Sequence, residues 1–150
     1  MKITIGSDHG ATELKEEIKT VLKEFDGMEI NDVGTFGTEA VDYPDIAEKV
    51  CADVVSGKAD RGIVLCGTGI GISIAANKIN GIRCALATDV YSAKMCREHN
   101  DANVLALGGR VTGFGPAGEI VRAFVTGEFS GGRHARRVDK IMALQDKQGK

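Results

Sequence analysis

The sequence predicts an α/β protein: a five-stranded parallel sheet with helices on both faces, which is a three-layer sandwich. Two observations predict this fold. Short apolar segments of strand length alternate along the chain with longer segments in which apolar residues recur at helical spacing. Glycine and polar residues follow most of the apolar segments, as is typical of sheets that bind ligands at the carboxyl ends of their strands. The chain has 150 residues, so we expect a single domain over residues 1–150.

The first predicted strand leads into a helix, and the second leads into a loop. Residues 2–6 are the first strand, and apolar residues then recur at helical spacing over residues 11–25 until Gly27 ends the helix. Residues 28–33 are the second strand, and the polar residues near its end indicate a short strand or one close to an edge. The loop covers residues 34–42.

The third predicted strand and its surroundings are the most informative part of the sequence. A helix capped by Asp42, with Pro44 in its first turn, continues until Gly57. Residues 63–65 are a short apolar run of the kind found in buried parallel strands, and Cys66 stands at its end. After it come Gly67, Thr68, Gly69, Ile70 and Gly71, and then a helix in which Ile72, Ile74, Ala75 and Ala76 are expected to be buried.

This glycine-rich turn predicts an anion-binding site that contains a thiol. Glycines allow backbone N–H groups to approach a ligand closely, and the start of a helix supplies partial positive charge. A thiol in that field should ionise more readily than a free cysteine. The alternative is that Cys66 is simply a small buried hydrophobic residue, which the glycines at alternate positions after it disfavour.

The second half of the chain continues the alternation of strands and helices. Residues 82–87 are the fourth predicted strand, Asp89 caps the helix that follows it, and residues 104–107 are the fifth strand. Another helix opens at Pro116. The last helix begins near Arg133, and we expect its apolar residues Val138, Ile141 and Met142 to anchor it in the core.

Composition and charge exclude several classes of protein. The chain is 43% hydrophobic and 27% charged with a formal net charge of −2, which argues against a general nucleic-acid binder. No apolar run approaches the length of a membrane span, and the first residues do not resemble a signal peptide. The four cysteines show no CxxC spacing, so we expect reduced thiols in a cytoplasmic protein, with neither a metal site nor a cofactor.

Polar residues outside the glycine-rich turn are the remaining candidates for a site. Asp8 and His9 follow the first strand and Arg110 follows the fifth, so the parallel topology places all three at the same edge of the sheet as Cys66. Asp8 could instead cap a helix. His99 lies in a polar cluster and suits acid–base chemistry, although it could also be a solvated loop histidine.

Two arginines in the last helix are candidates for binding an anion. Arg133 and Arg137 are four residues apart and so share one face of the helix. Two guanidinium groups side by side repel each other, which predicts a shared anion between them. The alternative is a solvated basic face of the helix.

Three classes of function compete for these residues. Gly67-x-Gly69 suggests a dinucleotide-binding module, but Ile72 occupies the third glycine position. A cysteine in a loop of this shape suggests a phosphatase, but such loops need an arginine at the position that Ile72 fills. A proton-transfer enzyme would use a thiolate base, backbone N–H groups, a histidine acid and an arginine clamp for phosphate. This third class requires no residue that the chain lacks.

Several segments carry a resemblance to a known family, and they span essentially the whole chain: residues 6–9, 32–35, 42–44, 66–78, 99–103 and 131–134. In these segments the sequence resembles type B ribose-5-phosphate isomerase. The wider family includes isomerases of allose 6-phosphate and galactose 6-phosphate. The resemblance implies a Rossmann-like fold and a metal-free aldose–ketose isomerisation in the pentose phosphate pathway. It also implies a homodimer or tetramer with the active site between subunits.

The resemblance assigns roles by position. It makes Cys66 the catalytic base and His99 the group that assists ring opening and donates a proton, with Thr68 nearby. The expected reaction interconverts ribose 5-phosphate and ribulose 5-phosphate through a cis-enediolate. A hexose 6-phosphate substrate (allose or galactose), or a non-enzymatic module that binds sugar phosphate or a dinucleotide, stays open. The implied substrate-binding residues are Asp8, His9, Gly67, Thr68, Gly69, Ile70, Gly71, Asn100, Arg110, Arg133 and Arg137.

Overall fold

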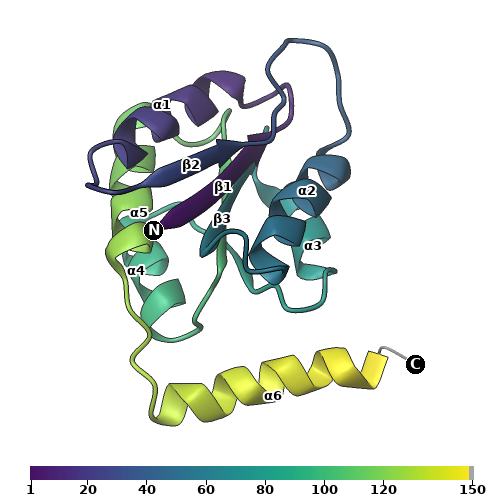
Figure 1. The fold of residues 1–150 in the computed structure, drawn as a ribbon, viewed down its shortest axis with the longest axis vertical. Helices are drawn as coiled ribbons and strands as arrows, with labels where there is room; N and C mark the ends of the chain where they lie inside the picture. The colour runs from purple at the N-terminus through teal and green to yellow at the C-terminus, as the bar shows by residue number, and fades with distance from the viewer. Residues whose placement is uncertain (149–150) are drawn as a thin grey trace.

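Five parallel strands form the sheet of the computed structural model, which describes residues 1–148 (Figure 1). Their order is β2-β1-β3-β5-β4, and every neighbouring pair is parallel. The carboxyl ends of all strands therefore point to one edge of the sheet. The predicted α/β fold is confirmed, and β2 is an edge strand as its polar end indicated. The strands are β1 (Lys2–Ser7), β2 (Glu29–Asp32), β3 (Arg61–Cys66), β4 (Cys84–Leu86) and β5 (Val104–Gly108).

Helices cover both faces of the sheet, and one helix lies apart from it. The helices α1, α4 and α5 pack on one face, and α2 and α3 pack on the other (Figure 1). No helix within residues 1–148 is both long and apolar enough to cross a membrane. The helices are α1 (Thr12–Leu22), α2 (Tyr43–Val55), α3 (Ile70–Asn77), α4 (Val90–Glu98), α5 (Phe114–Thr126) and α6 (Arg133–Gln148).

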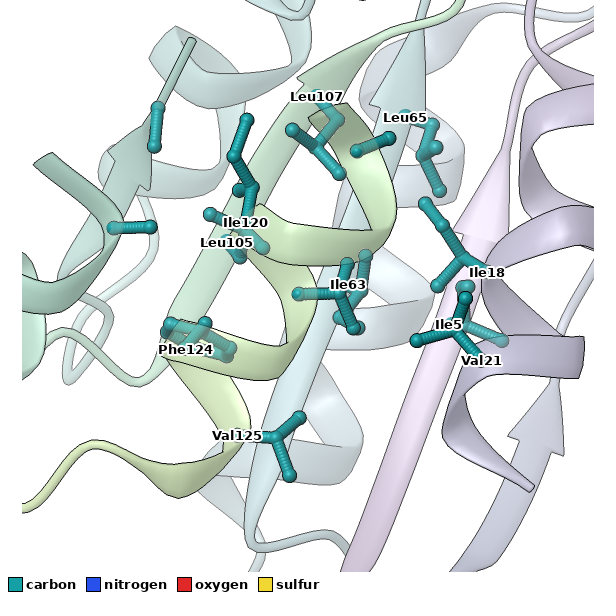
Figure 2. Close-up of a cluster of buried hydrophobic side chains, with 14 of the residues drawn as sticks. Ile5, Ile18, Val21, Ile63, Leu65, Leu105, Leu107, Ile120, Phe124 and Val125 are labelled. Atoms are coloured by element: carbon teal, nitrogen blue, oxygen red, sulfur yellow. The ribbon is translucent and has the colours of Figure 1, made fainter. Parts of the chain in front are cut away.

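The core lies between the sheet and its two helical layers. The strands in the middle of the sheet are buried on both faces, which is why their sequences are apolar without alternation. On the face of α1 and α5, Ile63 and Leu105 pack with Ile120 and Phe124 (Figure 2). The central strands are therefore rigidly placed, and so are the turns that follow them.

Three expectations about burial and capping are wrong, each for a local reason. The fourth strand comprises only Cys84–Leu86 and is partly exposed, because it lies at the edge of the sheet. Ile74 is 57% exposed, since the inner face of α3 is formed by Ile72, Ser73 and Ala76. Asp42 stands at the N-cap of α2, but among the described residues its carboxylate caps no N–H group of that helix. Asp89 does cap α4, by accepting a hydrogen bond of 2.7 Å from the Ser92 N–H.

The sequence predicted that the last helix, α6, packs into the core of its own chain, and this prediction is wrong for most of the helix. Its apolar residues Ile141 and Leu144 are 46% and 56% exposed, and only Val138 is buried. An extended segment connects α6 to α5 and carries it away from the layers of the sheet (Figure 1). Such an exposed apolar stripe on an ordered helix is typical of a surface that packs against another molecule.

Candidate active site

Cys66 stands at the tip of β3, directly before the start of α3. Its Sγ accepts a hydrogen bond of 3.2 Å from the Gly69 N–H, and the residue is 4% exposed. Gly69 has a φ of 79°, in the left-handed region, and this turn brings the chain back over the sulfur. The Gly69 N–H and the start of α3 therefore place backbone donors, with their partial positive charge, beside the sulfur. The geometry therefore suits a thiol that works as a base.

The turns at this edge of the sheet pack against one another through backbone atoms. The Gly109 N–H donates to the carbonyl oxygen of Cys66 at 2.9 Å, and the Arg110 N–H donates to that of Gly67 at 2.9 Å. A Cβ atom added at Gly108 would lie 2.5 Å from the Thr68 backbone. The glycines are thus required for close approach, and the position of each turn is fixed by its neighbours.

Asp8 and His9 face the cysteine turn from the end of β1. Asp8 is 6% exposed, and its Oδ1 accepts a hydrogen bond of 2.8 Å from the Gly10 N–H. This contact closes a local turn, so Asp8 does not cap α1, whose N-cap residue is Ala11. His9 is exposed, and its Nδ1 accepts a hydrogen bond of 3.2 Å from the Val41 N–H. In the neutral imidazole the proton is then on Nε2, which is left to donate to a ligand.

A buried ion pair holds the loop that orients His9. The Lys15 ammonium, on a residue that is 1% exposed, lies 2.9 Å from Asp32 Oδ1 and donates to the Thr35 carbonyl oxygen at 2.7 Å. Burial acts to raise the pKa of Asp32, but hydrogen bonds from Lys19, Lys15 and Gly34 outweigh it, and the net shift is downward. Asp32 is therefore ionised at neutral pH, and it fixes the start of the loop that leads to Val41.

The side chains of Arg110 and Tyr43 both pack on the glycine-rich turn. The Arg110 side chain packs over Gly67, and a Cβ atom added there would lie 3.3 Å from Arg110 Nη1. The Tyr43 ring covers Gly71, because a Cβ atom at that glycine would lie 2.6 Å from Cζ. We call the following group the cysteine site: Asp8, His9, Cys66, Gly67, Thr68, Gly69, Ile70, Gly71 and Arg110.

The other predicted site residues lie at the opposite edge of the sheet. His99 and Asn100 follow α4 and precede β5, whose residues Val104 and Gly108 pair with Gly62 and Cys66 of β3. The strand segment between these two pairings spans about 13 Å. Within one chain, the structure therefore does not bring His99 and Asn100 to Cys66.

Arg133 and Arg137 belong with His99, not with Cys66. The imidazole rings of His99 and His134 stack with their centroids 4.1 Å apart and their planes 9° from parallel. This stack ties the first turn of α6 to the end of α4. Burial lowers the pKa of His134, and the nearby charges of His99, Arg133 and Arg137 lower it further. We call the following group the remote cluster: His99, Asn100, Arg133, His134 and Arg137.

Sequence reasoning missed His134 of the remote cluster and Tyr43, which covers Gly71 of the cysteine site. His134 and Tyr43 both lie in segments that carried the family resemblance, and that was the only signal for them. The stack of His134 on His99 and the cover of Tyr43 over Gly71 depend on residues far apart in the chain. No periodicity or spacing in the sequence could have indicated them.

The other cysteines differ from Cys66 in their surroundings. Burial raises the pKa of the Cys51 thiol to about 12 and that of Cys96 to about 11, and it also raises the pKa of Cys84. These thiols are therefore protonated at neutral pH and serve in packing. Residues 1–148 contain no group of three histidine, cysteine or acidic side chains that could hold a metal ion.

Comparison with known proteins finds relatives that match almost the whole chain. The model of the family described as Ribose/Galactose Isomerase matches residues 3–141. The chain is 47% identical over 146 residues to ribose-5-phosphate isomerase B of Escherichia coli, with 97% of each chain covered. It is 53% identical over 148 residues to a putative sugar phosphate isomerase of Bacillus subtilis, covering 98% of this chain and 99% of that one. A structure of ribose-5-phosphate isomerase B from Clostridium thermocellum superposes with a TM-score of 0.96 and 58% identity, covering 99% of this chain and 100% of that one.

Proposed function

Because the chain belongs to the ribose/galactose isomerase family, we propose that it interconverts ribose 5-phosphate and ribulose 5-phosphate through a cis-enediolate. The chain is an isomerase, which sets aside a purely binding module. The observation that carries the proposal is the placement of Cys66 Sγ under the Gly69 N–H at the start of α3. This placement puts the proposed base next to the backbone donors of the glycine-rich turn.

Cys66, Thr68 and the backbone of the glycine-rich turn are assigned the proton-transfer step. As a thiolate, Cys66 takes the proton from C2 of the open-chain aldose and returns it to C1 of the enediolate. The Thr68 Oγ1 already accepts the Ile70 N–H at 3.2 Å, so its own proton is left to donate to a substrate oxygen. Those backbone N–H groups of residues 67–71 that do not already donate to Cys66 or Thr68 stabilise the developing oxyanion, each by about 3 kcal/mol.

Ring opening and phosphate binding are assigned to His99 and the arginines. His99 assists opening of the furanose by delivering a proton to the ring oxygen. Arg110, Arg133 and Arg137 are exposed, and none forms an ion pair with another described residue. Guanidinium groups without a carboxylate partner suit a dianionic phosphate. We assign the phosphate to these three arginines.

One sugar phosphate can meet both groups of residues only if two chains contribute. The cysteine site and the remote cluster lie at opposite edges of one sheet. A homodimer in which α6 of one chain reaches the cysteine site of the other would place His99, Arg133 and Arg137 opposite Cys66. Each dimer would then contain two such composite sites, related by symmetry.

Exposed apolar residues support this pairing. Ile70 and Ile74 of α3 are 52% and 57% exposed beside the cysteine site, and Tyr91 of α4 is 71% exposed. Between α6 and the rest of its own chain lies a cavity of about 640 Å³, lined in part by Ile141 and Leu144. A second copy of the chain, with its α3 seated against α6, would bury both surfaces. Burying them would contribute roughly 25 cal/mol per Å² of apolar area.

The test is an isomerisation assay on the purified protein in the presence of EDTA. Ribose 5-phosphate should be converted to ribulose 5-phosphate, and the rate should be unchanged by EDTA because backbone donors replace a Lewis acid. Allose 6-phosphate, galactose 6-phosphate and unphosphorylated ribose serve as comparison substrates. If a hexose 6-phosphate is turned over faster than ribose 5-phosphate, the chain is an isomerase of that hexose 6-phosphate. A rate that EDTA abolishes and a divalent ion restores would contradict the proposed mechanism.

A further inference from the structure

Arg97 connects the two parts of the chain that carry the remote cluster. It is 7% exposed, and its Nη1 donates to Asp101 Oδ1 at 2.9 Å and to the Ala102 carbonyl oxygen. Its Nε donates to the Gly127 carbonyl oxygen at 3.4 Å. The first two contacts lie in the turn that follows His99 and Asn100. The third lies where the chain leaves α5 on its way to α6.

The junction at Gly127 is built around Arg97. A Cβ atom added at Gly127 would lie 2.7 Å from Arg97 Cβ and 3.0 Å from the Ala123 carbonyl oxygen, so no larger residue fits without displacement. Arg61 donates to the same carbonyl oxygen through its Nη2 at 3.1 Å. Two guanidinium groups thus converge on one carbonyl oxygen, and they fix the direction in which the segment departs.

Two guanidinium groups buried close together repel each other, so their pairing at Gly127 costs free energy and calls for an explanation. Burial, with a contribution from Arg97, lowers the pKa of Arg61 to about 10. Asp101 is the carboxylate that faces Arg97, and it also pairs with Arg83 at 3.2 Å. A single lysine ammonium could not reach the Asp101, Ala102 and Gly127 oxygens together, because it is a point charge without a planar fork.

Two further contacts connect the turn after α4 to the segment between α5 and α6. The Ser130 N–H donates to the Glu98 carbonyl oxygen at 3.0 Å, and the His99 ring stacks on the His134 ring. We propose that Arg97 is a positioning residue that holds His99 in fixed relation to Arg133 and Arg137, and so sets the geometry of the site in the partner chain. This inference rests on the proposed function, in which one chain supplies the remote cluster to the cysteine site of the other.

The test uses full-length chains in heterodimers that are purified through two different affinity tags. One chain carries Cys66→Ala and the other carries Arg97→Gln. One site of this dimer then has both defects. The other site combines the intact Cys66 of the Arg97→Gln chain with the intact remote cluster of its partner.

The Arg97→Gln homodimer should lose about tenfold or more in kcat/KM and bind inorganic phosphate, measured as a competitive inhibitor, about tenfold more weakly. Its Cys66 should react with iodoacetamide at the wild-type rate, because the cysteine site is built by other elements. In the heterodimer, the intact site should recover kcat/KM to within about twofold of the wild-type value per site. A matched control is Arg122→Gln, which removes an arginine that pairs with Glu24 at 2.8 Å on the outer face of α5 and should leave all values unchanged.

The outcomes separate this inference from the proposed function. Wild-type kinetics in the Arg97→Gln homodimer, or a heterodimer no faster than that homodimer, would overturn the role of Arg97. A heterodimer of Cys66→Ala with His99→Ala tests the shared site by itself. If that dimer is active while the Arg97 heterodimer is slow, only the inference fails; if it is inactive, the shared site fails. Should Arg97→Gln not fold, Gly127→Ala displaces the same side chain and is expected to give the same pattern.

Discussion

The two edges of the sheet hold their functional residues in different ways. At the carboxyl edge, backbone contacts between neighbouring turns place Cys66, and added side-chain atoms at Gly69 or Gly108 would collide with backbone atoms. At the opposite edge, side chains such as Arg97 and the His99–His134 stack hold the remote cluster, and α6 exposes its apolar residues. The first edge is packed through backbone contacts within one chain, whereas the second leaves apolar side chains of α6 exposed.

This difference matters because the two groups of residues have different tasks in the proposed function. Reacting atoms need positions fixed to a fraction of an ångström, which tightly packed backbone supplies. In the proposed homodimer, the phosphate clamp comes from the second chain, so the site closes only when the dimer forms. A substitution in the cysteine site should therefore impair the site that its own chain's Cys66 serves. A substitution in the remote cluster should impair the site that contains the partner's Cys66.

The largest expected effect is at the cysteine site itself. Cys66→Ala removes the proposed base, and kcat should fall by a factor of about 10² or more, since general bases contribute roughly 10²–10⁴. The measurement is the initial rate of ribose 5-phosphate isomerisation. Cys51→Ala is the matched control, because this thiol is fully buried in the contact between α2 and the sheet and should leave kcat unchanged. Wild-type turnover by Cys66→Ala would remove this thiol from the mechanism.

A smaller effect is expected at the remote cluster. Arg137→Ala should lower kcat/KM for ribose 5-phosphate by about 10–100-fold, since charge-assisted hydrogen bonds contribute roughly 1.5–3 kcal/mol each. Turnover of free ribose, which carries no phosphate, should barely change. Arg136→Ala removes the exposed neighbour that projects from a different side of α6, and it is the control. If the ratio between the two substrates is the same in Arg137→Ala and wild type, the phosphate is held elsewhere.

The last comparison concerns the free energy of unfolding and distinguishes a crowded turn from an open one. Gly57 and Gly69 have φ values of 77° and 79°, but a Cβ atom would meet nothing within 4 Å at Gly57 and would lie 2.8 Å from Leu107 backbone at Gly69. Gly57→Ala should cost about 1 kcal/mol for the left-handed backbone alone. Gly69→Ala should cost about 3 kcal/mol because crowding adds to it. Urea unfolding at one subunit concentration measures both, and equal costs would show that the cysteine turn is not tightly packed.

Much of the fold could be predicted from the sequence because its signals are local. The apolar run ending at Cys66, the glycines after it and the capping Asp89 each reflect contacts within a few residues. Parallel topology then determined which turns share an edge, and Asp8, His9 and Arg110 do lie near the glycine-rich turn. Ile74 and Ile141 were predicted to be buried but are exposed in this chain. The helical spacing of an apolar residue does not indicate whether its own chain covers it.

The remote cluster shows the limit of this reasoning. The four-residue spacing of Arg133 and Arg137 correctly indicated a shared helix face, but only the structure shows that this helix lies apart from the sheet. The segment between α5 and α6 contains two glycines with positive φ, Gly131 and Gly132, and its direction depends on contacts to Arg97 and Glu98. Such contacts between distant residues leave no periodic pattern in a sequence.

The most direct test of a site shared between two edges and two chains is complementation. Cys66→Ala and His99→Ala homodimers should both be nearly inactive. A heterodimer that contains one chain of each contains one site with both defects and one site with none. We predict that this heterodimer regains about half of the wild-type activity per dimer, since its sites act independently. A heterodimer that stays inactive, after its composition has been verified, would contradict the account and place Cys66 and His99 in the same chain's site.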